Sequence, residues 1–240
     1  MRILSIDSAT KAMSLAICEE DKLIASAFLN VGKTHSQRLL PLLDDLLREG
    51  GLSLSEIDRL AVTVGPGSFT GVRIGISTAK AMAYALQKEV VPVYTLDALA
   101  YQAKGYSTVI CPILDARKNE VYYGIYDREG QPLEPMGAKA PAALAAYLQE
   151  NYGEAASVLF LGDGADPYFP IMQASLPKQA KLAPASIRMM LAMGAGFWAL
   201  EHPEKAVSPM ELQACYLRAS EAEVQRQAKL AKEKEQQKGL

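Results

Sequence analysis

Hydrophobic and polar positions alternate through the first thirty residues, a pattern typical of β-strands. The segments RILSID, MSLAICEE and LIASAFLN are separated by turn residues in DSATKA and at Asp21-Lys22. They predict a three-stranded antiparallel meander. Leucines then recur at helical spacing, and Gly50-Gly51 is a stop signal, so a helix is expected over 36–49.

A glycine-rich turn and a second long helix follow. The β-branched run 60–64 leads into the turn, and helical spacing continues over 70–86. Another strand is expected at 90–94, and a further helix begins with DALAYQA. Strands and helices in this order predict an α/β fold with a mixed sheet.

The same pattern starts again in the second half of the chain. Residues 109–133 read strand, aspartate-containing turn, strand, turn, strand, and Asp115 occupies the place of Asp7. An internal repeat of this size decides the fold, because each copy forms one structural unit. We therefore expect a duplicated α/β fold with two mixed-sheet lobes and flanking helices, over 1–103 and 104–220.

Composition and charge narrow the possible functions. Half of the residues are hydrophobic and the net charge is −2, which argues against a protein that binds nucleic acid by itself. No apolar run is long enough to span a membrane, and MRILSID enters a strand without a signal-peptide pattern. Three scattered cysteines fit a reducing compartment, so we expect a cytoplasmic protein. The charged residues 221–240 predict a frayed helix or a disordered tail.

The glycine-rich segment TVGPGSFTGVRIG (63–75) matches no standard phosphate or nucleophile motif. Gly65 and Gly71 are too far apart for a P-loop, and Val72-Arg73 follows where Lys-Ser or Lys-Thr is needed. The spacing also departs by one residue from the dinucleotide fingerprint. Ser68 is not flanked as a nucleophile elbow requires. The segment predicts a tight strand-to-helix turn.

The helix after this turn carries small residues four positions apart: Gly71, Gly75, Ala79 and Ala83. Residues at this spacing form a flat ridge along one face, flanked by Thr78 and Met82. Two interpretations have equal weight: the ridge receives a helix of a partner protein, or it packs on the chain's own sheet. Leu42 lies outside the leucine stripe of the preceding helix, which favours a four-helix interface.

Two aspartates are the main candidates for chemistry. Asp7 and Asp115 each end an equivalent strand, and paired carboxylates across a cleft can hold a magnesium–nucleotide complex. The alternative, equally weighted, is that Asp7 accepts hydrogen bonds within its own turn. His35 and His202 are isolated, so no metal site is expected.

The duplicated pattern with Asp7 at the first turn resembles the ASKHA superfamily of actin, sugar kinases and heat-shock ATPases, whose core is RNase H-like. In that superfamily the first turn reads D-x-G-[ST] and holds phosphate, whereas here it is Asp7-Ser8-Ala9-Thr10. RILSIDSAT, THSQRLLPLL, GPGSFTGVRIG, LDARKNEVYYGIY and CYLR occur in an order that closely resembles the bacterial TsaB (YeaZ) family over residues 1–218.

The resemblance implies a non-catalytic subunit of the complex that makes N6-threonylcarbamoyladenosine in tRNAs reading ANN codons. Its catalytic relative TsaD has a two-histidine metal motif where this chain has Thr95–Leu99, which contains no histidine. The resemblance also implies a TsaE-type ATPase partner, indirect contact with tRNA, and a possible homodimer in isolation. No cofactor is expected on this chain alone, whereas ATP or ADP is possible in the complex.

Within that family the helices 36–49 and 70–86 are expected to bind the same helices of TsaD. The predicted contact residues are Leu39, Leu43, Leu46, Gly71, Val72, Gly75, Thr78, Ala79 and Met82. Asp7, Ser8 and Thr10 are expected to form a degenerate phosphate turn, and no catalytic residue is assigned. Two alternatives stay open: an independent ATP-dependent kinase or hydrolase, and a metallopeptidase, which the lack of an H-E-x-x-H motif disfavours.

Overall fold

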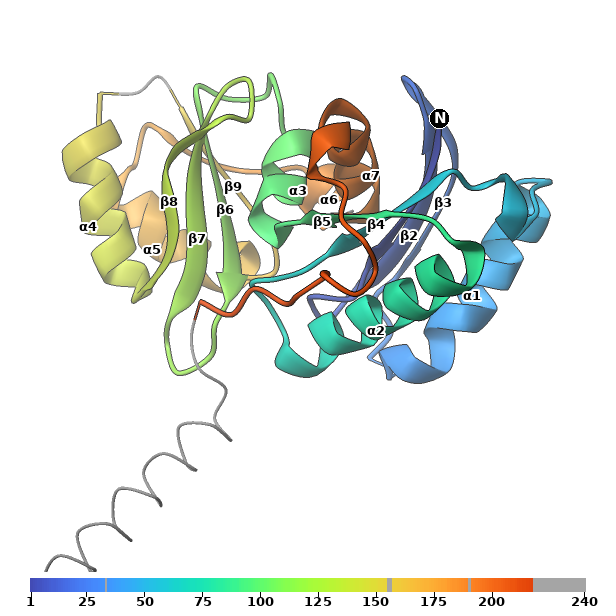
Figure 1. Cartoon of the computed structure of the whole chain (residues 1–240). Coiled ribbons are helices and arrows are strands. Elements are labelled where there is room, and N and C mark those ends of the chain that lie inside the picture. The colour runs from blue at the N-terminus through green and yellow to red at the C-terminus, as the bar shows by residue number, and fades with distance from the viewer. Residues whose placement is uncertain (33, 155–156, 190, 218–240) are drawn as a thin grey trace, which may run out of the picture.

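The computed structural model describes residues 1–32, 34–154, 157–189 and 191–217. The predicted charged tail at 221–240 lies outside the described residues. Within them the chain forms two five-stranded sheets with helices around and between them (Figure 1).

The first sheet contains the predicted N-terminal meander. Three antiparallel strands follow one another, and two later strands join β1 in parallel, which gives the order β3-β2-β1-β4-β5. The strands are β1 (Arg2–Asp7), β2 (Met13–Glu19), β3 (Lys22–Leu29), β4 (Arg59–Thr63) and β5 (Val90–Val93). Strands β1 and β4 are buried on both faces, and the polar Ser5 and Asp7 of β1 are buried with their apolar neighbours.

The second sheet repeats this arrangement, which confirms the duplication. Its order is β10-β9-β6-β7-β8, with β6 antiparallel to β7 and parallel to β9. Its strands are β6 (Val109–Asp115), β7 (Val121–Asp127), β8 (Pro132–Lys139), β9 (Val158–Leu161) and β10 (Ala180–Leu182). Asp7 and Asp115 end β1 and β6, as predicted. The sequence pattern missed β10, because three residues are too short to show periodicity.

Helices cover both sheets (Figure 1). Helices α1 (His35–Glu49) and α2 (Phe69–Leu86) lie on one face of the first sheet, and α4 (Pro141–Tyr152) and α5 (Ala165–Ser175) cover the second sheet. Between the sheets lie α3 (Thr95–Gln102) and α7 (Leu191–Glu201), with the short α6 (Ala185–Arg188) before α7. Two 3₁₀ turns, η1 (Leu54–Glu56) and η2 (Pro203–Lys205), complete the described helices.

The last part of the described chain returns to the first sheet. The Ser14 hydroxyl accepts the Ala192 N–H at 3.0 Å, so α7 lies against β2. After α7, Val207 pairs with Val90 of β5, and residues 208–217 form an extended strap that buries Leu212 in the N-terminal core. Residues that the repeat pattern grouped with the C-terminal lobe thus cover the N-terminal lobe. A repeat in strand order does not determine where a later helix packs.

Candidate functional site

The glycine-rich turn lies directly on the turn that follows β1. A Cβ atom on Gly67 would be 2.3 Å from the Ala9 carbonyl oxygen, and one on Gly71 would be 2.0 Å from the Ser8 carbonyl oxygen. At Gly75 it would be 2.6 Å from the Ser8 hydroxyl. These three glycines allow α2 and its preceding loop to approach the first turn more closely than any side chain permits.

Hydrogen bonds hold this contact together. The Ser68 N–H donates to the Ala9 carbonyl at 2.7 Å, and the Ser8 hydroxyl donates to the Gly71 carbonyl at 2.8 Å. Ser68 also caps α2, because its hydroxyl accepts the Gly71 N–H at 3.2 Å. The glycine-rich turn and the first turn are therefore fixed to each other, and residues of both line one cavity.

The small-residue ridge of α2 faces the chain's own sheet, so its interpretation as an open surface is corrected. Gly71, Gly75, Ala79 and Ala83 are buried over β1 and β4. Val72 is buried with them. A helix that lies flat on two strands needs small residues along the contact. Packing on the chain's own sheet, the second of the two interpretations, therefore explains the ridge.

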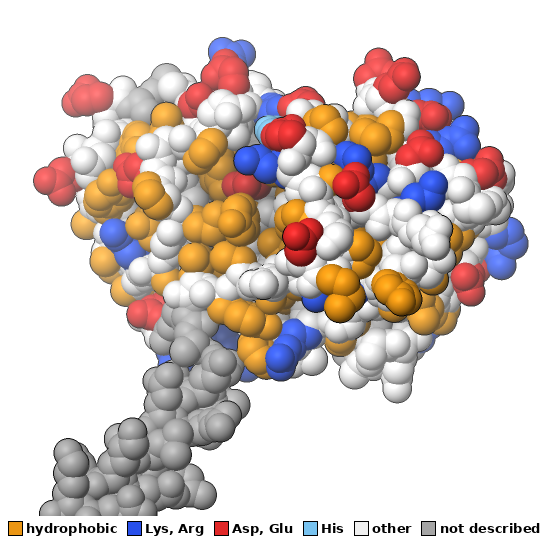
Figure 2. All heavy atoms as spheres, viewed as in Figure 1, with side chains coloured by type: hydrophobic (Ala, Val, Ile, Leu, Met, Phe, Trp, Pro, Cys, Tyr) orange, Lys and Arg blue, Asp and Glu red, His pale blue; other side chains and the backbone are white. Residues whose placement is uncertain are grey.

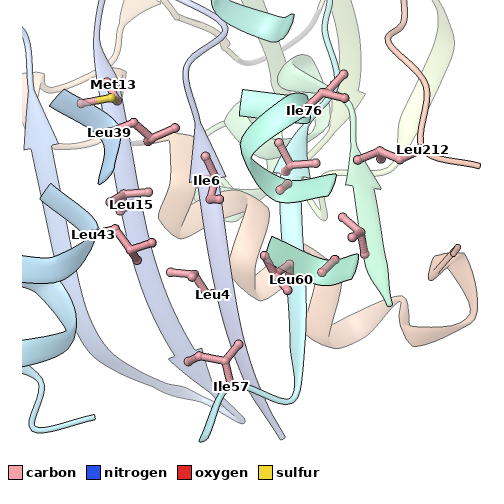
Figure 3. Packing of buried hydrophobic residues seen from close by; sticks show 14 of the residues in the cluster. Leu4, Ile6, Met13, Leu15, Leu39, Leu43, Ile57, Leu60, Ile76 and Leu212 are labelled. Atoms are coloured by element: carbon pink, nitrogen blue, oxygen red, sulfur yellow. The ribbon is translucent and has the colours of Figure 1, made fainter. Parts of the chain in front are cut away.

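The leucines of α1 are also part of the core. Leu39, Leu43 and Leu46 have 2%, 4% and 5% of their surface exposed. Figure 3 shows Leu39 and Leu43 lying beside Leu15 of β2. Of the nine predicted contact residues, Thr78 and Met82 are half-buried and the other seven are buried in this chain. Whether any of the nine touches a partner stays a prediction.

A groove between α1 and α2 is the accessible feature of this face. Its cavity measures about 490 Å³ and is lined by Ser36, Leu39, Leu40, Phe69, Thr70, Arg73, Ile74, Ser77 and Thr78. Leu40 is 54% exposed at its edge. The Arg73 guanidinium lies over the Phe69 ring, 4.5 Å from its centre. The groove therefore presents apolar and hydroxyl groups with one cation.

Asp7 is buried and bonded within the fold. One carboxylate oxygen accepts the Thr63 hydroxyl at 2.7 Å and the Ala9 N–H at 3.1 Å. The other oxygen has no hydrogen-bond partner. Burial raises the pKa of Asp7 to about 6, although the bonds from Thr63 and Ala9 lower it. The bond within its own turn is the alternative that sequence analysis gave for this residue.

The other predicted members of the turn, Ser8 and Thr10, also bond internally. The Thr10 hydroxyl accepts the Ala12 N–H at 3.2 Å, and the Thr10 carbonyl lies 2.8 Å from His35 Nε2. His35 thus joins the start of α1 to the first turn. A role of this kind was not distinguishable from a surface histidine in the sequence.

A larger cavity of about 890 Å³ opens between the two lobes. Its walls include Thr10, Lys11, His35, Ser68 and Thr70 from the first half of the chain, and Asp115, Arg117, Lys118, Tyr122 and Asp163 from the second. The strap closes one side with Cys215, Tyr216 and Leu217. Asp7 does not line it, so Asp7 and Asp115 do not face each other across this cavity.

The described residues were predicted to contain no metal site and no membrane-spanning segment. Over the described ranges, no group of three His, Cys, Asp or Glu side chains is arranged to hold a metal ion. The segment Thr95–Leu99 forms the start of α3, where Asp97 accepts the Tyr126 hydroxyl at 2.6 Å. No described helix combines the length and hydrophobicity needed to cross a bilayer.

The chain is similar in sequence and in structure to proteins of tRNA modification. The family model for TsaD, tRNA N6-adenosine threonylcarbamoyltransferase, matches residues 29–201. The Bacillus subtilis tRNA threonylcarbamoyladenosine biosynthesis protein TsaB is 35% identical over 68% of this chain and 71% of its own length. The Escherichia coli TsaB protein is 42% identical over 54% of this chain and 56% of its own length.

The solved structure of YeaZ from Pseudomonas aeruginosa has a TM-score of 0.74 at 30% identity, covering 90% of this chain and 99% of that one. The chain belongs to the TsaB (YeaZ) family.

The chain has the duplicated two-lobed α/β fold that its resemblance to the ASKHA superfamily implied. A Clostridium difficile activator of 2-hydroxyisocaproyl-CoA dehydratase superposes with a TM-score of 0.55 at 13% identity, covering 90% of this chain. That structure contains bound ADPNP, which is a property of the activator. At this identity the likeness shows the fold alone.

Sequence reasoning missed the aromatic contact between the strap and the start of α2. The Phe69 and Tyr216 rings lie 5.0 Å apart, and the Cys215 N–H donates to the Val64 carbonyl at 2.7 Å. These contacts fix the strap to the glycine-rich turn. The sequence CYLR marked this segment as part of the family pattern, but one tyrosine in an extended segment does not reveal its distant partner.

Proposed function

We propose that this chain is a subunit of the machinery that makes threonylcarbamoyladenosine in tRNA, and that it binds a TsaD-type catalytic subunit. Its TsaB relatives are named for that biosynthesis. The chain spans only about half the length of the Escherichia coli relative, so the assignment rests on the family and the site together. The catalytic chemistry belongs to the partner, and this chain contributes binding.

The observation that carries the proposal is the way the chain uses its glycine-rich turn. Gly67 and Gly71 bring α2 against the first turn, and Ala9 stands where a phosphate turn has glycine. Asp7, which lies behind this contact, is fully buried. This disfavours the alternative of an independent ATP-dependent kinase or hydrolase, which would use Asp7 as a solvent-accessible carboxylate.

The surface proposed to bind the partner is the outer side of α1 and α2. Leu40, Arg73, Ile74 and Ser77 are accessible there, and they surround the groove between the two helices. A helix of the partner can lay an apolar stripe along this groove, with its polar groups meeting Arg73 and the hydroxyls. The buried leucines and glycines support the surface from beneath and set the angle between the helices.

A binding experiment tests the proposal with matched variants. Leu40→Asp places a charge at the groove, whereas Leu133→Asp places the same charge at an exposed leucine of β8 in the other lobe. We expect the wild-type chain and Leu133→Asp to co-elute with the TsaD-type subunit, and Leu40→Asp to elute alone. Equal co-elution of both variants would reject this surface, and no co-elution of the wild type would reject the partnership.

A further inference from the structure

The cavity between the lobes is lined by basic side chains that are not part of the proposed partner surface. Lys11 projects from the first turn, and Arg117 and Lys118 project from the loop between β6 and β7. Lys11 and Arg117 are exposed, and they line the same cavity from opposite lobes. A chain of net charge −2 therefore gathers cations at one opening.

The carboxylates in this cavity are engaged by their own loops. An oxygen of Asp115 accepts the Arg117 N–H at 2.8 Å, and an oxygen of Asp163 accepts the Asp115 N–H at 3.0 Å. Burial raises the pKa of Asp163, and the charge of Lys11 opposes this rise. Lys11, Arg117 and Lys118 line the cavity together with these two carboxylates, the His35 ring and hydroxyls such as Thr70.

An aromatic platform borders the cations. The Tyr216 ring contacts Phe69 and is still 42% exposed, and both residues line the cavity. Figure 2 shows basic and hydrophobic side chains next to one another at the lower centre of the molecule, between the lobes. Cations beside an exposed aromatic ring are the combination that binds unpaired nucleotides, because phosphates meet the cations and bases stack on the ring.

We propose that this cavity binds a single-stranded segment of RNA, with Lys11 and Arg117 contacting phosphates and Tyr216 stacking on a base. The proposal rests on the proposed function, which brings tRNA to the complex, and it adds a direct contact by this chain. A mononucleotide is the competing occupant, because Ala9 and Thr10 of the first turn also line this cavity. An extended strand instead uses the width of the opening and both lobes.

The same cavity adjoins the proposed partner groove. Ser36, Phe69, Thr70 and Ile74 line both cavities. RNA bound between the lobes would therefore lie next to a catalytic subunit docked on α1 and α2. This continuity favours RNA over a protein ligand, because the RNA is the substrate that the partner must reach.

Fluorescence anisotropy with a labelled RNA stem–loop tests the proposal, on the full chain and on its complex with the TsaD-type subunit. Lys11→Gln with Arg117→Asn removes two cavity cations, and Lys22→Gln with Lys181→Gln removes two exposed cations from edge strands β3 and β10. Asparagine tolerates the positive φ of 60° at position 117. We expect only the cavity pair to weaken binding and to lower the slope of log K against log salt by about 1.4.

A second pair of variants tests the stacking contact. Tyr216→Leu should weaken stem–loop binding by about fivefold or more, whereas Tyr106→Leu, at a 57% exposed tyrosine of the loop after α3, should leave it unchanged. Equal effects of the cavity and control variants would overturn the proposal. So would unchanged affinity for a fully paired duplex relative to the stem–loop, or displacement of the stem–loop by micromolar ATP.

Failure of this proposal differs from failure of the proposed function. Partner binding is measured by co-elution without RNA, and the RNA titration is also run on the chain alone. A chain that co-elutes with its partner but shows no cavity-dependent RNA binding keeps the proposed function and loses this inference. A chain that binds RNA through the cavity but does not bind the partner keeps this inference and loses the proposed function.

Discussion

Single residues explain why the most distinctive segment of the sequence packs inward. The spacing of Gly65, Gly67 and Gly71 excludes the standard phosphate motifs, and that much follows from the sequence. The contacts of Gly67 and Gly71 with the backbone of Ala9 and Ser8 do not follow from the sequence, because those partners lie some sixty positions earlier in the chain. A pattern of small residues shows that something approaches closely and cannot show what it is.

Gly71→Ala tests this close approach. In an ordinary helix, alanine is more stable than glycine by about 1 kcal/mol. Here the new Cβ would be 2.0 Å from the Ser8 carbonyl oxygen, so we expect a loss of about 1–3 kcal/mol in the free energy of unfolding. Urea titration of Gly71→Ala against Ser77→Ala, an exposed position of the same helix, measures the difference. A stabilised Gly71→Ala chain would contradict the packing.

Asp7 predicts a pH dependence of stability. Its pKa rises from 3.8 to about 6 on folding, so the folded chain holds this proton more tightly than the unfolded chain. The contribution of Asp7 to stability therefore falls as pH rises from about 4 to 6, by on the order of 3 kcal/mol. Urea titrations across this range should show a steeper decline for the wild type than for Asp7→Asn. Parallel curves would mean that Asp7 is not buried as described.

At the scale of elements, periodicity predicted α1, α2 and both meanders but misjudged the outward faces of the helices. The stripe of Leu39, Leu43 and Leu46 was correctly identified as apolar, and it is the stripe that covers the sheet. Sequence alone cannot tell which of two apolar surfaces on a helix meets the chain's own core. Leu40, outside the stripe, is 54% exposed and belongs to the surface that we propose binds a partner.

The two kinds of leucine in α1 should respond differently to truncation. Leu43→Ala removes a core side chain and should lower the free energy of unfolding by about 2–5 kcal/mol. Leu40→Ala should change it by about 0.5 kcal/mol or less, because its side chain is exposed in the chain alone. Thermal unfolding followed by circular dichroism measures both. A large loss at Leu40 would show that this residue belongs to the core.

For the whole molecule, the repeat predicted two lobes but not how the end of the chain joins them. Helix α7 packs on β1 and β2, and its neighbour α3 contacts β6 of the second sheet. One buried cluster contains Ile3 and Val91 from the first sheet with Leu159 from the second. The lobes therefore share a core, which a linear division at residue 103 could not represent.

This shared core predicts cooperative unfolding of the described structure. Trp198, the single tryptophan of the chain, lies on α7 and reports the packing between the sheets. We expect its fluorescence and the far-ultraviolet circular dichroism to change at the same denaturant concentration. Two separated transitions would show that the lobes unfold independently and that α7 stabilises only one of them.

We propose that this chain serves tRNA modification by binding a catalytic partner rather than by chemistry of its own. N6-threonylcarbamoyladenosine is measured in tRNA from cells in which the natural chain is deleted and one variant of it is expressed instead. We expect the wild type, Leu133→Asp and Asp7→Asn to restore the modified nucleoside, whereas Leu40→Asp does not. Restoration of the modified nucleoside by Leu40→Asp would contradict this proposal. So would its absence in cells with an Asp7→Asn chain that folds and binds the partner.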